Sequence, residues 1–139
     1  HISFDDVTEI VGFSRKYNTW ELVDSVGKKN LKKALEIMNN MLEEGASAVG
    51  LIMQLVQRII LLLKIRTALD LGYNQTHITQ SLKLRPYFAK LYLEQAAHFK
   101  IEQLYHGLQC FKEADYTIKT GRVKPVMALT LAVYEFVKF

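Results

Sequence analysis

The sequence predicts an all-α fold, a compact bundle of about eight helices around a central buried helix. Three observations lead to this prediction. Apolar residues recur at helical spacing along most of the chain, and no run alternates apolar and polar residues long enough to indicate a sheet. Residues that favour helix N-caps precede many of these segments, and glycines follow several of them. Half of the 139 residues are hydrophobic, which allows a sizeable core and argues against disorder.

The central helix is predicted between Ser47, a suitable N-cap, and Gly72, which suits a left-handed C-terminal position. Two apolar stripes run along this segment, and a helix that is apolar nearly all round lies inside a core. The first stripe comprises Leu51, Ile52, Leu55, Ile59, Leu62, Leu63 and Leu69, and the second comprises Val49, Met53, Val56 and Ile60.

A membrane span is the alternative interpretation of this segment. A span needs about 20 mostly apolar residues. Here the run is interrupted by Gln54, Gln57, Arg58, Lys64 and Arg66. The segment is therefore predicted to be the core helix of a soluble domain, with no membrane partner.

Three helices are predicted before the central one. Ser3 and Asp6 suit a capping box, and Asn18 and Asn30 suit N-caps, with Glu21 three residues after Asn18. Glycines close each segment. The predicted elements are the helix Phe4–Val11 ended by Gly12, a connector Phe13–Tyr17, a helix from Asn18 to Val26 ended by Gly27, and the helix Leu31–Glu44 ended by Gly45.

Four helices are predicted after the central one. Asn74 suits an N-cap, and proline fits the first turn of a helix because its missing N–H is not needed there. The elements are Gln75–Leu82, a helix from Pro86 to about Phe99, Ile101–Thr120 followed by Gly121, and Val126–Lys138 opened by Pro125. Lys100 and Lys124 stand where a Ser, Thr or Asp cap would be expected.

Composition narrows the class of protein. The net charge of +4 is mild for a nucleic-acid-binding domain, in which basic residues gather on one face. Cys110 is the single cysteine, so no internal disulfide can form, and a reducing cytoplasm is expected. No signal peptide or lipidation motif is visible. Because the chain begins with His1 rather than Met, a piece of a longer protein is expected.

No motif indicates an enzyme. Neither GxxxxGK[ST] nor GxGxxG occurs, so no phosphate cradle, no ATP binding and no cofactor are expected. His77 and His98 are isolated, and no serine or acid stands at a recognisable triad spacing. Glu102, His106 and Cys110 share a helix face, but each four-residue step drifts by about 40°, so they converge poorly on one ion. A solvated helix face with a half-buried cysteine is the favoured interpretation.

A DNA-binding interpretation rests on Asn74–Phe99, which has the pattern of a helix-turn-helix with Lys90 on its second helix. The favoured interpretation is an αα-corner, because that helix otherwise offers mainly Tyr, Phe and Leu. The basic cluster Lys28, Lys29, Lys32 and Lys33 is interpreted as a solvated helix start rather than a phosphate site. The four methionines, Met38, Met41, Met53 and Met127, are interpreted as core filler.

Two segments, 17–65 and 95–122, resemble the C-terminal domain of the delta subunit of bacterial DNA polymerase III. The first segment carries an aromatic-x-Leu/Val-Val-Asp pattern, a glycine, a Lys-Ala-Leu helix, another glycine and a long apolar helix. The second ends in an acid, an Ile, a Lys and a small turn. The matching positions are Trp20–Asp24, Gly27, Lys33–Leu35, Gly45 and Leu51–Ile65, then Ala114, Asp115, Ile118, Lys119 and Gly121.

The resemblance implies a role in the clamp loader, the ATP-driven machine that opens the ring-shaped sliding clamp and places it on primed DNA. Residues 1–12 would be the last helix of a lid domain and residues 13–139 a helical collar domain. The implied function is non-catalytic assembly with gamma/tau-type and delta-prime-type subunits in the cytoplasm. The clamp would be contacted through a missing N-terminal module, and DNA only indirectly. The alternative function is helix-turn-helix DNA binding.

A collar domain must leave apolar surface for its neighbours, and the last two helices are the best candidates. Their core residues are spaced on one face, while Tyr105, Tyr116, Met127 and Tyr134 point elsewhere. Tyrosine is a common interface anchor because its ring is apolar and its hydroxyl stays hydrated. These four residues are predicted to form a subunit interface.

Overall fold

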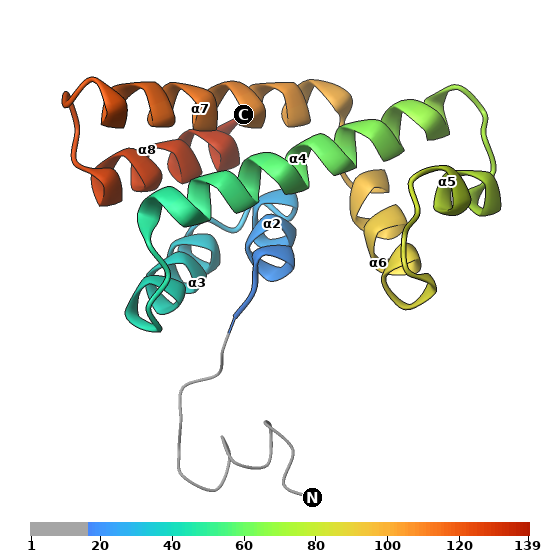
Figure 1. Cartoon of the computed structure of the whole chain (residues 1–139), viewed down its shortest axis with the longest axis horizontal. Helices are drawn as coiled ribbons and strands as arrows, with labels where there is room; N and C mark the ends of the chain where they lie inside the picture. The colour runs from blue at the N-terminus through green and yellow to red at the C-terminus, as the bar shows by residue number, and fades with distance from the viewer. Residues whose placement is uncertain (1–16) are drawn as a thin grey trace, which may run out of the picture.

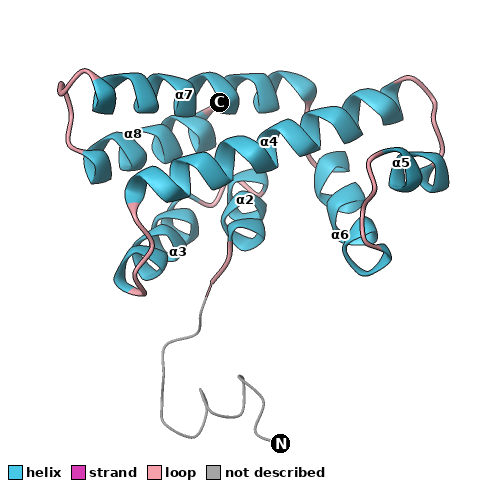
Figure 2. Ribbon diagram, viewed as in Figure 1, coloured by secondary structure: helices cyan, strands magenta, loops and turns pink. Residues whose placement is uncertain are grey.

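The computed structural model of the chain describes residues 17–139, which form α-helices and no strand (Figure 2). The all-α prediction is therefore confirmed. The predicted helix Phe4–Val11 lies outside the described residues. The seven helices in the described range are α2 (Thr19–Gly27), α3 (Leu31–Glu43), α4 (Ala48–Asp70), α5 (Gln75–Ser81), α6 (Pro86–Ala97), α7 (Ile101–Lys119) and α8 (Pro125–Lys138).

The long helix α4 crosses the middle of the view in Figure 1. α7 and α8 form an antiparallel pair along one side of it, α2 and α3 lie on the other side, and α5 and α6 lie towards its C-terminal end. α4 contacts α2, α5, α6, α7 and α8, and α8 contacts α2, α3, α4 and α7. The last helix of the chain is thus packed against the first helices that the structure describes.

Aromatic rings fill the space between α6, α7 and α8. The ring of Phe136 in α8 stacks on the ring of Phe99, with 6.0 Å between the ring centres. It meets the ring of Phe111 edge-on, with 5.9 Å between the ring centres. Gly107 of α7 makes this packing possible, because a Cβ atom there would lie only 2.4 Å from Cε1 of Phe136. The absence of a side chain at Gly107 therefore lets the ring approach the helix backbone.

Four of the predicted N-caps are confirmed, and the capping box predicted at Ser3 and Asp6 lies outside the described residues. The side-chain oxygens of Asn18, Asn30, Ser47 and Asn74 accept hydrogen bonds from backbone N–H groups three residues later, at 2.9, 3.0, 2.9 and 2.7 Å. At Lys100, which cannot cap, the backbone N–H donates instead to Oε1 of Gln103 at 2.8 Å. Each interaction satisfies an N–H group that the helix leaves without a partner.

Three of the predicted C-terminal glycines adopt left-handed backbone: Gly45, Gly72 and Gly121 have φ of 108°, 90° and 72°. α2 ends at Gly27, one residue later than the predicted Val26. Gly27 itself does not adopt left-handed backbone, and Lys29 takes that conformation with φ of 57°. A Cβ at Gly27 would lie 3.2 Å from the Phe99 ring, so this glycine serves the contact between helices.

The second apolar stripe of α4 is not buried, which corrects the expectation of a helix apolar nearly all round and enclosed. Val49, Met53 and Ile60 are exposed and Val56 is half-buried, while Leu51, Ile52, Leu55, Ile59, Leu62 and Leu63 are buried as predicted. The interpretation of the methionines as core filler holds for Met38 and Met41 and is wrong for Met53 and Met127, which are exposed.

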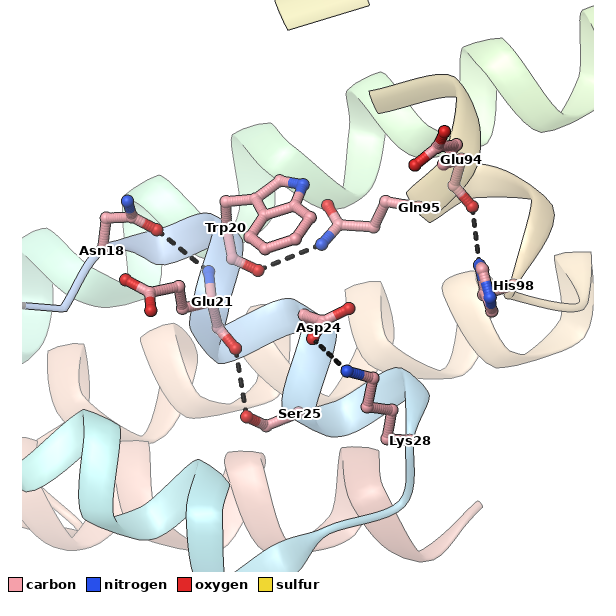
Figure 3. A network of polar contacts seen from close by, with 9 residues as sticks. All are labelled: Asn18, Trp20, Glu21, Asp24, Ser25, Lys28, Glu94, Gln95 and His98. Atoms are coloured by element: carbon pink, nitrogen blue, oxygen red, sulfur yellow. Dashed lines mark hydrogen bonds and ion pairs between the residues drawn. The ribbon is translucent and has the colours of Figure 1, made fainter. Parts of the chain in front are cut away.

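A polar contact joins α2 to α6 (Figure 3). The exposed fraction of Gln95 is only 3%. Its side-chain Nε2 donates a hydrogen bond to the backbone oxygen of Trp20 at 3.0 Å. On α2 itself, Ser25 donates to the backbone oxygen of Glu21 at 3.1 Å. A buried amide bonded to a neighbouring helix fixes the position of that helix, because the bond cannot be exchanged for one to water without exposing the group.

Candidate functional site

The four residues predicted to form a subunit interface all lie on the surface. Tyr105 and Tyr116 of α7 are each 57% exposed, and Met127 and Tyr134 of α8 are 55% and 40% exposed. Their role in binding stays a prediction. Cations already lie over two of the rings: Arg122 is 5.9 Å from the Tyr116 ring centre, and the Lys138 ammonium is 5.3 Å from that of Tyr134.

Helical geometry arranges these side chains in two rows. At about 100° per residue, Tyr105 and Tyr116 lie about 20° apart around α7, and Met127 and Tyr134 are equally close around α8. Leu131 is exposed on α8 between Met127 and Tyr134. The sequence analysis did not include Leu131. Its position, four residues after Met127 and three before Tyr134, places it on the same helix face as both, and this spacing could have identified it. We call Tyr105 and Tyr116 the α7 row, and Met127, Leu131 and Tyr134 the α8 row.

An open groove of about 410 Å³ lies between α7 and α8, the two helices that carry the rows. Its apolar walls include Ala114, Ala128 and Ala132, and Leu131 belongs both to its wall and to the α8 row. Glu113 of α7 and Glu135 of α8 also line it. The groove exists because small side chains on both helices leave unfilled space between them.

Cys110 and His106 lie in this groove. His106 Nε2 is 3.0 Å from the backbone oxygen of Glu135 and 3.5 Å from the Cys110 sulfur. Within residues 17–139, no group of three or more His, Cys, Asp or Glu side chains is placed to hold a metal ion, so Glu102, His106 and Cys110 are not brought together as ligands. Burial raises the pKa of the Cys110 thiol to about 11, and the carboxylates of Glu135 and then Glu113 add to the effect.

Cys110 should therefore be a slow nucleophile at neutral pH. With a pKa of about 11 instead of 9.0, its thiolate fraction at pH 7.5 is roughly a hundredfold lower, and only the thiolate reacts. Alkylation by iodoacetamide, followed by mass spectrometry, should show a rate that keeps rising between pH 9 and pH 11. A rate that levels off below pH 9 would contradict this expectation, and the same chain unfolded in urea provides the control.

A second groove of about 270 Å³ lies between α4 and α7. Met53 and Val56 line it from α4, and Lys112, Asp115 and Lys119 line it from α7. Lys119 pairs with Asp115 at 2.8 Å. The second stripe of α4 therefore forms an exposed apolar strip beside basic residues, instead of part of the core.

Most of the basic cluster after α2 is occupied by contacts within the chain. Lys28 pairs with Asp24 at 3.0 Å, and Lys33 lies 3.0 Å from Glu36 and 2.9 Å from the Tyr17 hydroxyl, to which it donates. Lys29 donates to the backbone oxygen of Phe139. These contacts agree with the interpretation of this cluster as a helix start rather than a phosphate site.

The helix pair of the DNA-binding interpretation is present as α5 and α6. α6 is held against α4, and its buried residues include Leu93 and Ala96. Lys90, Tyr87 and Phe88 are exposed. Arg58 of α4 lies 4.5 Å from the Tyr92 ring centre and donates to its hydroxyl at 3.3 Å.

By length and composition, α4 is the one helix in the described range that is long and apolar enough to cross a membrane. Its most apolar 18-residue segment is 44% buried inside the structure. A core helix passes the same test. Here one face of α4 is buried, and this face includes Leu51, Leu55, Ile59 and Leu62. Burial in the bundle accounts for the first apolar stripe of this helix.

Comparison with known proteins gives one consistent result. The family described as the DNA polymerase III delta subunit, C-terminal domain, matches residues 16–136. The DNA polymerase III subunit delta of Bacillus subtilis (strain 168) is 26% identical over 137 residues, which are 99% of this chain and 40% of that protein. The solved structure of the Bacillus subtilis DNA clamp loader delta protein superposes with a TM-score of 0.82 at 26% identity, covering 97% of this chain and 40% of that one. The chain thus spans about two fifths of the length of these relatives.

Proposed function

Since this chain belongs to the family of the C-terminal domain of the DNA polymerase III delta subunit, we propose that it is a non-catalytic assembly domain of a bacterial clamp loader. In this proposal it packs against the other loader subunits, of the gamma/tau and delta-prime types, in the cytoplasm. That packing holds the loader together while the sliding clamp is opened and loaded on primed DNA. Contact with the clamp belongs to the part of the protein outside this chain, and contact with DNA is indirect.

The observation that carries the proposal is the pair of rows beside the α7/α8 groove. Five large apolar or aromatic side chains are exposed there on two adjacent helices. A contiguous apolar surface that the fold itself does not cover is typical of a site where another chain binds. Tyrosine and methionine are enriched at such sites.

We also propose the internal organisation that goes with this function. Residues 13–139 make up the collar domain, and residues 1–12 belong to the domain before it. α4 is the helix around which the collar is organised, and its contacts with five other helices support this role. A long helix that is packed against five others keeps the α7/α8 surface in a fixed orientation relative to the remainder of the protein.

The double change Tyr116→Ser and Tyr134→Ser tests the assembly function. Both rings are exposed, so the melting temperature and helicity should stay nearly unchanged. Assembly of the full-length delta subunit with the other loader subunits of its organism should weaken by about tenfold or more, as expected for truncated interface anchors. Sedimentation velocity at several concentrations measures the affinity.

Tyr73 and Tyr87 provide a matched control, because both are exposed and lie at the opposite end of the domain, before and within the α5/α6 corner. The double change Tyr73→Ser and Tyr87→Ser should leave assembly at the wild-type affinity. If the Tyr116/Tyr134 variant also assembles with wild-type affinity, these residues do not form the subunit interface.

A further inference from the structure

The α7/α8 groove has the shape of a site for a third helix. Its walls carry the small side chains of Ala114, Ala128 and Ala132, and its volume is about 410 Å³. Small residues on two packed helices leave a channel in which the side chains of an added helix can sit. The α7 and α8 rows are exposed on the same two helices, and Leu131 of the α8 row lines the groove itself. This is the arrangement in which an amphipathic helix binds through a stripe of apolar anchors.

The charges in the groove specify the occupant further. Glu113 and Glu135 line it from opposite helices, and both are exposed. In the described part of the chain neither carboxylate forms an ion pair. Three cations of α7, α8 and the loop that joins them have other partners: Lys119 pairs with Asp115, and Lys138 and Arg122 lie over tyrosine rings.

Both carboxylates line the groove together with Cys110, and they lie close enough to its thiol to raise the pKa of that group. An apolar helix laid over the groove would remove both charges from water without giving them a partner, which costs free energy. A helix that brings Lys or Arg side chains to these positions would avoid this cost.

We propose that the α7/α8 groove binds an amphipathic helix of a neighbouring loader subunit, one that carries an apolar stripe for the two rows and Lys or Arg side chains for Glu113 and Glu135. This inference rests on the proposed assembly function and specifies the chemistry of the partner surface. The two carboxylates select against an acidic helix, because like charges brought together at an interface are strongly unfavourable.

Charge variants of the full-length delta subunit test the proposal. The affinity for the other loader subunits is measured by sedimentation for the wild type, for Glu113→Lys with Glu135→Lys, and for Glu113→Gln with Glu135→Gln. The lysine pair should weaken assembly by about tenfold or more, and the glutamine pair by less. Wild-type affinity should fall as NaCl is raised, and the glutamine pair should show a weaker dependence on salt.

Glu43→Lys with Glu94→Lys is the matched control, because it makes the same change in net charge at exposed residues of α3 and α6, which do not line the groove. This control should assemble within about threefold of the wild type. Equal weakening in the control and in the groove variant would overturn the proposal, since it would reflect net charge alone. An unchanged affinity of the groove variant would also overturn it.

Cys110 supplies an independent readout because it lies in the groove between the two carboxylates. Its alkylation at pH 9, followed on the peptide that contains it, should slow by about tenfold on assembly of the wild-type complex. No slowing would mean that the groove stays open, which overturns the proposal.

If the wild-type protein fails to assemble at all, the proposed function itself fails. If the groove variants abolish self-association of the chain instead, the occupant is a second copy and the proposed partner is wrong.

Discussion

Replacing Ile59 with alanine should lower the free energy of unfolding by about 2–5 kcal/mol, the range found when a large aliphatic side chain is removed from a packed core. Ile59 has 0% exposure and lies near the middle of α4, whose buried face contributes eight residues to the core. The loss combines the apolar area returned to water with the cavity that remains, since neighbouring helices cannot collapse onto it. Urea denaturation followed by circular dichroism gives the change directly.

The next residue provides the control for this experiment. Ile60 follows Ile59 on the same helix but is 37% exposed, so Ile60→Ala removes the same atoms from the surface. Its effect should stay within about 0.5 kcal/mol, apart from a small gain in helix propensity. Equal unfolding midpoints for Ile59→Ala and wild type would show that α4 is not the helix around which the domain is organised.

Gly107→Ala should also destabilise the domain, although alanine favours helix. Alanine gains about 1 kcal/mol over glycine in a helix interior. The added Cβ would, however, lie within 2.7 Å of three atoms of the Phe136 ring, which is buried between Phe99 and Phe111. Overpacking of a core costs about 1–3 kcal/mol or more. The Phe136 ring has little room to move, because Phe99 and Phe111 enclose it. The net result should be a lower unfolding midpoint.

A double-mutant cycle identifies the cause. In a Phe136→Leu background the ring is gone, so Gly107→Ala should cost less than in the wild type and could even stabilise α7 through its propensity. If the cost of Gly107→Ala is the same in both backgrounds, contact with Phe136 is not the reason that glycine is needed there.

The N-caps were predictable because a cap is a local interaction. Asn18, Asn30, Ser47 and Asn74 each bond a backbone N–H group three residues away, and no distant element decides the outcome. The helix ends at Gly45, Gly72 and Gly121 were predictable for the same reason, because the left-handed backbone of a glycine is also a local feature. At Gly27 the sequence could not show a second role, the contact with the Phe99 ring, because that ring lies 72 positions along the chain.

The buried face of α4 was only half predictable. Both of its apolar stripes have helical spacing, and spacing cannot tell which stripe a neighbouring helix will cover. Met53 is exposed and Leu55 is buried because the helices that contact α4 cover the stripe with Leu55 and leave the stripe with Met53 open to solvent. In the candidate site, the exposed tyrosines were identified from their position off the core stripe. The groove and its two carboxylates were not, because they depend on how α7 and α8 pack together.

The attachment of α5 has a consequence for local stability. α5 has seven residues, and Ile78 is its one buried residue. Isolated helices of this length are unstable in water, so α5 depends on that side chain and on its contacts with α4 and α6. Its backbone N–H groups can exchange with solvent through a small local opening, while those of α4 and α8 are protected until much of the domain unfolds. The domain is thus divided into a slowly exchanging block, which carries the α7/α8 surface, and a corner that opens independently of it.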